Sequence, residues 1–375
     1  MFYVCSKRKN MVNFMNDTRP TARKGRGAGT NESGRFERER REAFHDGWEP
    51  DPEAEPQKVA THYSRDSAKT ILARNDSPDI PFDRSINPYR GCEHGCIYCF
   101  ARPTHAYLGL SPGLDFETQI FVKEDGPDLL RAELARPSYT CRTIALGANT
   151  DPYQPAERKY GLTRRILEVL RELRHPVSIV TKSALVARDI DILADMAKQR
   201  LCSVAISVTT LDRDLARVME PRAATPQRRL DTMRILADAG VPVCVLASPM
   251  IPALNDNELD HILEAGAAHG AQAAGTIMVR LPLELGPLFE NWLERHFPDK
   301  AKHVLSLIRQ ARGGKIYVSE WGTRMTGTGP YAELLQLRFA KACRRLGLNE
   351  RRSAFELDKT LFRKPAKVGD QLNLL

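Results

Sequence analysis

Short apolar segments alternate with helical patterns through the middle of the chain, and this alternation limits the fold more than any other feature. The helical patterns carry apolar residues at every third or fourth position, whereas the apolar segments have the length of single strands. We expect strands at 143–147, 177–181, 203–208, 241–247 and 276–280, and helices at about 160–174, 188–200, 225–239 and 256–269. Such alternation predicts a parallel α/β sheet, which a barrel and a doubly wound open sheet would both satisfy.

A second feature is the stretch INPYRGCEHGCIYCF at 86–100, which contains three of the eight cysteines. Cys92, Cys96 and Cys99 have CxxxCxxC spacing, so one short loop can direct three thiolates at one point. Thiolates are soft ligands that suit zinc or iron–sulfur clusters. A [4Fe–4S] cluster ordinarily takes four protein ligands, so three would leave one iron open to another molecule.

A structural zinc site is the alternative at this loop, because His94 lies between the cysteines and has the chemistry of a fourth ligand. Zinc sites more often show two Cys or Cys/His pairs separated by a spacer. A disulfide is disfavoured, since nothing in the sequence marks an oxidising compartment.

The cysteine spacing, with Tyr98 directly before the last cysteine, resembles the cluster motif of the radical S-adenosylmethionine (SAM) enzymes. In that family the open iron chelates SAM, and the reduced cluster cleaves it to a 5′-deoxyadenosyl radical. The segments RGCEHGCIYCFAR, GANTDPYQPAE, VTKSAL and SVTTLD are similar to the spore photoproduct lyase branch. The resemblance covers roughly residues 80–285 and implies a partial (β/α)6 TIM-like barrel, whose first strand leads into the cysteine loop.

The resemblance places SAM contacts after successive strands, where parallel α/β proteins carry their chemistry. The segment at 147–151 stands where the family binds the amino group of SAM, and its candidate residues are Gly147, Asn149, Thr150 and Asp151. A proline-stiffened turn capped by Asp151 is the alternative. Spore photoproduct lyase has a cysteine near this place that returns a hydrogen atom to the product. Asn149 and Thr150 stand there instead, which argues against thymine-dimer reversal.

Four further cofactor contacts follow from the resemblance. Lys182 matches a lysine that contacts the SAM carboxylate, although a surface lysine would also fit the position. Ser207 matches a hydroxyl that contacts the ribose, with Thr209 as its substitute. Ile251, in the apolar segment after the strand at 241–247, is expected against the adenine, and Tyr98 beside the cluster.

The segments on either side of this core differ from it in composition and in hydrophobic pattern. We expect a basic, largely disordered N-terminal arm at 1–67, the radical SAM core at 68–285, a helical C-terminal extension at 286–365 and a flexible tail at 366–375. The tail ends in QLNLL, Gln371–Leu375, which resembles the peptide that bacterial DNA-handling proteins dock into the sliding clamp. No long uncharged apolar run marks a signal peptide or membrane span, so we expect a cytoplasmic protein without membrane contact.

These observations predict a radical SAM enzyme with a [4Fe–4S] cluster and SAM, reduced by a flavodoxin or ferredoxin-type protein. The net charge of +9 favours a partner that carries phosphate, so nucleic acid, as in DNA repair, is the expected substrate. The alternatives are a radical SAM enzyme acting on RNA, protein or a metabolite, and a non-catalytic iron–sulfur protein that docks on DNA machinery.

Overall fold

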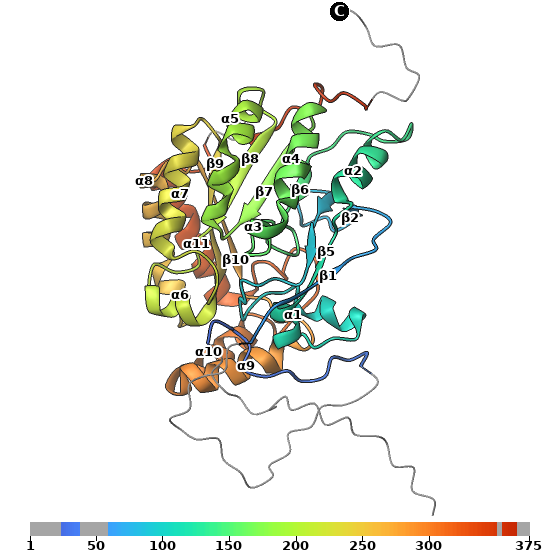
Figure 1. The fold of residues 1–375 in the computed structure, drawn as a ribbon. Helices are drawn as coiled ribbons and strands as arrows, with labels where there is room; N and C mark the ends of the chain where they lie inside the picture. The colour runs from blue at the N-terminus through green and yellow to red at the C-terminus, as the bar shows by residue number, and fades with distance from the viewer. Residues whose placement is uncertain (1–23, 38–58, 351–354, 366–375) are drawn as a thin grey trace, which may run out of the picture.

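Six parallel strands form the centre of the molecule, and they follow one another in space in the order of the chain (Figure 1). This computed structural model describes residues 24–37, 59–350 and 355–365. The strands are β3 (Arg84–Ile86), β6 (Ile144–Leu146), β7 (Val177–Thr181), β8 (Cys202–Ser207), β9 (Val243–Met250) and β10 (Ala273–Met278). A seventh strand, β2 (Leu72–Arg74), is antiparallel to β3. The predicted strands are confirmed, and so is the open parallel sheet expected of a partial (β/α)6 barrel.

Helices connect consecutive strands of this sheet, as the sequence pattern predicted. They are α2 (Gly126–Leu134), α4 (Leu162–Glu172), α5 (Ile190–Lys198), α7 (Pro226–Asp238) and α8 (Leu259–Ala268). In α4 the buried residues Leu162, Ile166, Leu167 and Leu170 recur at helical spacing, so one face of the helix is apolar and packs on the core. Crossover helices of this kind keep neighbouring strands parallel and bring all their carboxyl ends to one edge.

The cysteine loop follows a strand of a second, smaller sheet. It consists of β1 (His62–Arg65), β5 (Gln119–Val122) and β4 (Tyr89–Arg90), with β5 in the middle. The segment between β4 and β5 contains the cysteines, the 3₁₀ helix η1 (Arg102–Leu108) and the short helix α1 (Leu114–Thr118). The segment at 101–121, with its Pro and Gly residues, is thus an ordered insertion rather than a single helix.

The remaining elements are helices that do not belong to the set above. They are α3 (Glu157–Tyr160), η2 (Ala184–Asp189), α6 (Arg213–Met219), η3 (Asp256–Glu258), α9 (Leu285–His296), α10 (Pro298–Gln310) and α11 (Gly329–Leu346). Helix α11 lies along α8, and its Leu335 belongs to the main apolar cluster. Helices α9 and α10 pack on each other and share a second apolar cluster with Ile97 of the cysteine loop. None of the helices described is long and apolar enough to span a bilayer.

Residues 24–37, which we call the strap, correct part of the prediction of a disordered arm. The strap runs beside α1 and α9 (Figure 1). The carboxylate of Glu117 in α1 accepts hydrogen bonds from Gly27 N (3.0 Å) and Ala28 N (2.8 Å). Arg26 donates to the Glu117 carbonyl at 2.8 Å. Hydrogen bonds and charge contacts hold most of the strap, and of its apolar side chains Ala28 is buried in an apolar cluster. Such contacts leave no periodic pattern in the sequence. Residues 1–23 and 38–58 of the predicted arm lie outside the described part of the chain.

An ion pair joins a segment next to the first parallel strand, β3, to a segment next to the last, β10. Asp79 lies in the connection from β2 to β3, and Arg324 lies in the segment that follows α10. The Arg324 guanidinium donates to both carboxylate oxygens of Asp79, at 2.7 and 2.5 Å. The same segment is tied to β10, because Met278 N donates to Met325 O at 2.9 Å. The ion pair thus bridges the side of the sheet that hydrogen-bonded strands leave open.

Candidate functional site

The cysteine loop lies over the carboxyl ends of the parallel strands, and its backbone is fixed at several points. Cys92 N donates to Phe116 O at 2.9 Å, and Ile97 N donates to Met219 O at 3.0 Å. Gly95 has a φ of +68°, and an added Cβ would lie 2.7 Å from the Glu117 carboxylate. A side chain at this position would therefore clash as well as strain the backbone.

Arg102 organises the loop from inside, a role that the sequence gave no reason to assign. Its side chain is fully buried, and its Nε donates to Cys96 O at 2.9 Å. Its Nη2 donates to Gly95 O at 3.1 Å and to the Glu117 carboxylate at 2.5 Å. The carbonyls of the loop thus point inward to a guanidinium, and Glu117 compensates its charge. Only its place, three residues after Cys99, distinguishes this arginine in the sequence.

The three thiols of the loop are sheltered but mutually close. Cys92 and Cys96 are buried, while Cys99 is half-buried and packs against both neighbouring apolar clusters. Burial raises the pKa of all three thiols, so thiolates there require a compensating cation. The donor set therefore fits an iron–sulfur cluster.

Single-ion binding fits the loop less well. Among the residues that the structure describes, no three His, Cys, Asp or Glu side chains are grouped to hold one metal ion. A [4Fe–4S] cluster bonds each thiolate to a different iron, so its ligands stand farther apart than those around one zinc ion. His94, the fourth ligand of the zinc alternative, has its Nδ1 3.3 Å from the Asp151 carboxylate.

Lys182 and Ser207, which follow or end neighbouring strands, meet beside the cysteine loop. The Lys182 ammonium donates to Ser207 Oγ at 2.8 Å, and Ser207 Oγ donates to Ser248 O at 3.0 Å. The ammonium also lies 5.8 Å from the centroid of the Tyr98 ring. Burial lowers the pKa of Lys182, although the Cys96 thiol opposes this effect. A buried ammonium held by one hydroxyl retains donors for an anionic ligand.

Tyr98 and Thr209 join a buried network with Glu220 and Arg229. The Tyr98 hydroxyl lies 3.1 Å from Thr209 Oγ1 and donates to Glu220. Thr209 Oγ1 also donates to Glu220 at 2.7 Å, and Arg229 forms an ion pair with the same carboxylate. The network fixes Tyr98, and with it the loop, to β8 and α7. In the sequence Glu220 is marked only by the proline that follows it, and Arg229 only by its place in a helical pattern.

Both carboxylate oxygens of Asp151 already accept hydrogen bonds from the protein itself. Its Oδ1 accepts from Thr181 Oγ1 (2.7 Å) and Tyr153 N (2.9 Å), and its Oδ2 accepts from Lys182 N at 2.8 Å. His94 approaches Oδ2 as well. Burial by itself would raise the pKa of Asp151, but His94 and these hydrogen bonds outweigh it and lower the pKa to about 2. The carboxylate therefore ties the cysteine loop to the end of β7.

The other residues of the segment after β6 have distinct environments. An added Cβ at Gly147 would lie 2.4 Å from Val180 O, so close approach to β7 already accounts for this glycine. Asn87 Oδ1 accepts from Asn149 N at 2.8 Å, while the Asn149 residue is exposed. Thr150 is buried, and its hydroxyl donates to Tyr89 O at 2.9 Å.

Ile251 lies at the same edge of the sheet but is fully buried. Its N–H donates to Asn255 Oδ1 at 2.6 Å, and Asn255 Nδ2 donates to Thr209 O at 2.7 Å. The side chain packs in the apolar cluster of α9 and α10. Asn255 therefore fastens the turn after β9 to the end of β8.

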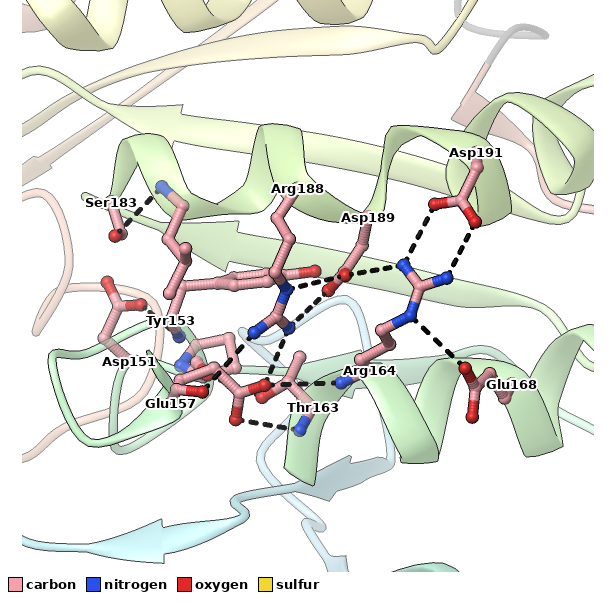
Figure 2. Close-up of polar contacts among 12 residues, drawn as sticks. Asp151, Tyr153, Glu157, Thr163, Arg164, Glu168, Ser183, Arg188, Asp189 and Asp191 are labelled. Atoms are coloured by element: carbon pink, nitrogen blue, oxygen red, sulfur yellow. Dashed lines mark hydrogen bonds and ion pairs between the residues drawn. The ribbon is translucent and has the colours of Figure 1, made fainter. Parts of the chain in front are cut away.

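A dense ion-pair network lies behind this edge, between α4 and η2 (Figure 2). The Arg188 guanidinium donates to Glu157 Oε1 and to Asp189 Oδ2, both at 2.8 Å. Arg164 donates to Asp189 at 3.1 Å and to Asp191 at 3.0 and 2.8 Å. Glu157 and Asp189 are fully buried. Each guanidinium in Figure 2 thus faces carboxylates of its own chain.

Comparisons with known proteins agree with this geometry. The sequence model of the radical SAM superfamily matches residues 86–266. An uncharacterized protein of Mycobacterium tuberculosis is 41% identical over 233 residues, which cover 62% of this chain and 68% of that protein. An uncharacterized protein of Methanocaldococcus jannaschii is 30% identical over 238 residues, 63% of this chain and 83% of that protein. The chain belongs to the radical SAM superfamily.

Solved structures show the same fold in spore photoproduct lyase. Its complex with dinucleoside spore photoproduct aligns with a TM-score of 0.55 and 16% identity, over 76% of this chain and 80% of that chain. A double mutant of the lyase, with bound AdoMet and the dinucleoside, gives the same TM-score. The predicted cofactors, a [4Fe–4S] cluster and SAM, are those of the superfamily. The radical SAM Nα-GlyT isomerase of Pseudomonas phage M6 is also similar, at 26% identity over 60% of this chain and 46% of that protein.

Proposed function

We propose that this chain reductively cleaves SAM and abstracts a hydrogen atom from a nucleic-acid substrate. The observation that carries the proposal is the convergence at one sheet edge of the cysteine loop with the Lys182–Ser207 pair, which approach it from separate strands. The [4Fe–4S] cluster, when bound, supplies the electron that cleaves SAM to the 5′-deoxyadenosyl radical. The protein supplies orientation and a sheltered site in which the radical survives.

In this proposal Cys92, Cys96 and Cys99 hold the cluster, and Arg102 holds the loop that carries them. The Lys182 ammonium binds the carboxylate of SAM, because it lies beside the loop and its one hydrogen bond to the described residues is to a hydroxyl. Ser207 then turns its hydroxyl to the ribose.

The segment after β6 divides into binding and positioning residues. Asn149, which is exposed, accepts from the amino group of SAM, while Gly147 lets the backbone approach β7. Asp151 and Thr150 position the loop instead, because their oxygens are occupied by partners within the chain. Thr209 supports Tyr98 in the same way. Ile251 closes the apolar wall on the adenine side.

Nucleic acid is the proposed substrate class. The net charge of +9 favours phosphate, and a solved structural neighbour binds a dinucleoside photoproduct. The chain has Asn149 and Thr150 where the lyase resemblance would require a cysteine, so we propose a different fate for the substrate radical than thymine-dimer reversal. A flavodoxin or ferredoxin-type protein in the cytoplasm is the proposed reductant.

Anaerobic SAM cleavage tests the proposal. The protein is reconstituted with iron and sulfide, reduced with dithionite and given SAM, and 5′-deoxyadenosine is quantified. We expect production that Cys96→Ala abolishes. Cys141→Ala is the matched control, because Cys141 is a partly exposed thiol that precedes β6, outside the cysteine loop, and its loss leaves production intact. A fully loaded wild-type cluster that yields no 5′-deoxyadenosine, even with nucleic acid present, would refute the catalytic proposal.

The sliding clamp remains a proposed partner through Gln371–Leu375, which lies outside the described residues. A pull-down on purified clamp compares the full chain with a chain that ends at residue 370. Equal retention of the two forms would end this proposal.

A further inference from the structure

Arg280 follows β10 and lies at the edge of the sheet that carries the cysteine loop. Val279 N donates to Met250 O at 2.9 Å, which fixes the residue before Arg280 to the end of β9. The guanidinium carbon of Arg280 lies 5.1 Å from the centroid of the Phe100 ring. Phe100 directly follows Cys99. The Arg280 guanidinium is therefore a neighbour of the cysteine loop.

The charge of Arg280 has no counterpart in the described part of the chain. Within residues 24–37, 59–350 and 355–365, its one hydrogen-bond acceptor is the Met325 thioether, 3.5 Å from Nη1. Its Nε is buried and has no partner among these residues. A guanidinium has five N–H donors and stays charged, and a thioether is a weak acceptor. Donors left unused in a partly buried place are unfavourable, so a ligand with several acceptor oxygens suits this position.

A second uncompensated cation lies close by. Arg312 donates to the carbonyl oxygens of Val279 (2.9 Å), Thr323 (3.3 Å) and Arg324 (2.9 Å), and no carboxylate in the described residues pairs with it. Burial lowers the pKa of Arg312, and the nearby Arg280 lowers it further. Two positive charges therefore add at this edge of the sheet, where the field favours an anion.

Exposed aromatic side chains accompany these charges. Phe100, whose ring lies under the Arg280 guanidinium, is 42% exposed, and Trp321 in the segment that contains Met325 is 62% exposed. Aromatic rings that face solvent beside a guanidinium are the surface on which nucleobases stack.

A similar pair lies where the strap meets the loop before α9. Phe36 and Tyr107 are exposed, with ring centroids 5.2 Å apart, and the Arg35 guanidinium lies over both rings. Arg35 is bound to Glu284, four residues after Arg280. At this second place Glu284 compensates the charge of Arg35, and the two exposed rings remain beside the strap.

We propose that Arg280 binds a backbone phosphate of single-stranded or locally opened nucleic acid, while Phe100 stacks on a base next to it. The inference rests on the proposed function and assigns its substrate contacts. The two non-bridging oxygens of a phosphate match the fork of a guanidinium. A carboxylate of a protein substrate would match the fork equally, but it would leave the exposed rings without a role.

Oligonucleotide binding to the anaerobically reconstituted protein tests this inference. The probe is a fluorescein-labelled single-stranded oligonucleotide, and its anisotropy is followed against protein at several salt concentrations. We expect Arg280→Gln to weaken binding about tenfold and to reduce the slope of log affinity against log salt by about one. Phe100→Leu weakens binding by about fivefold or more and leaves the salt slope unchanged.

Arg228→Gln is the matched control. Arg228 is exposed on α7, and its side chain forms no ion pair with the described residues, so it loses the same charge away from the loop. We expect wild-type affinity and wild-type salt slope. Iron content and the unfolding midpoint show that each variant is folded and loaded.

Two outcomes would overturn the inference, and a third would separate it from the proposed function. Equal affinity of wild type and Arg280→Gln for the oligonucleotide would overturn it. Loss of binding to a poly-glutamate peptide in Arg280→Gln, with oligonucleotide binding retained, would assign Arg280 to a protein substrate and also overturn it. A wild-type protein that binds the oligonucleotide through Arg280 but produces no 5′-deoxyadenosine would refute the proposed function and leave this inference standing.

Discussion

Arg188 and Arg280 show two opposite uses of a partly buried guanidinium in one molecule. Arg188 faces two buried carboxylates, Glu157 and Asp189, which accept its hydrogen bonds at 2.8 Å each (Figure 2). Arg280 donates, within the described residues, only to a thioether. A charge whose partners are buried with it belongs to the framework, since removing one partner strands the other. A charge left without a partner at the mouth of a site is available to a ligand.

Removal of one carboxylate from the paired region gives the largest expected effect. Glu157 accepts from Arg188, from Thr163 N at 2.9 Å and from the Tyr89 hydroxyl at 2.5 Å. We expect Glu157→Gln to lower the free energy of unfolding by about 4 kcal/mol, because it removes one of the two buried carboxylates that face Arg188 and disturbs the hydrogen bonds from Tyr89 and Thr163. Urea unfolding measures this. Glu172→Gln, which breaks the exposed pair with Arg131, is the control at about 0.5 kcal/mol.

The framework also carries groups that titrate, whereas a guanidinium does not. Burial lowers the pKa of His175 from 6.5 to about 4. The unfolded chain then binds the extra proton between these values, so stability is full above pH 6.5 and falls as the pH drops toward 4. The loss from this group is about 3 kcal/mol. Urea unfolding from pH 7 to 4 measures it.

The variant His175→Gln checks the assignment, since it removes the titrating group. We expect a shallower loss of stability with acid, the remaining slope coming in part from His105, whose pKa burial also lowers to about 4. An unchanged slope would place the pH dependence elsewhere.

A substitution in the strap, next to the cysteine loop, is expected to have a smaller effect on stability. An added Cβ at Gly27 would lie 1.9 Å from Gly95 O, a backbone atom that cannot move aside easily. We expect Gly27→Ala to cost about 2 kcal/mol of stability and to increase the reactivity of the apo thiols toward a thiol reagent. In Gly29→Ala the new Cβ meets the end of the flexible Arg295 side chain, so a smaller loss is expected. Identical thiol reactivity in the two variants would mean that the strap does not shelter the loop.

The smallest expected change in the free energy of unfolding is that of Arg280→Gln, in contrast to Glu157→Gln. Arg280→Gln removes no ion pair within the described residues, so the free energy of unfolding should change by less than about 0.5 kcal/mol. A loss as large as that of Glu157→Gln would show that Arg280 belongs to the framework after all.

The sequence predicted the main sheet well because its apolar segments alternate with amphipathic helices, which mark even the three-residue strand β6. Five apolar segments and four amphipathic helices lie where periodicity placed them. The small strands β1, β4 and β5 span only a few residues, and β4 has two, so no periodicity can develop in them. Glu117 explains the strap, yet its partners lie about ninety positions earlier in the chain, beyond any local pattern.

The sequence offered candidate residues for the site, but it did not reveal the hydrogen-bond partners of those residues. Lys182 and Ser207 meet because neighbouring parallel strands end at one edge, and their contacts with SAM stay a prediction. Asp151 had been expected to bind SAM, and its occupied oxygens became visible only once His94 and Thr181 were placed around it. The same holds for Arg280, since a sequence shows a charge but not whether a counter-charge faces it.

The bridge from Asp79 to Arg324 has a consequence for biosynthesis. The two residues are 245 positions apart, so the second partner leaves the ribosome long after the first. The cysteine loop, at 92–99, is made much earlier. The parallel strands can form in turn as they leave the ribosome, but contacts of such long range form late. We therefore expect the open side of the nascent protein to remain open until Arg324 has emerged, which leaves a period in which iron and sulfide can be delivered to the loop before the ion pair forms.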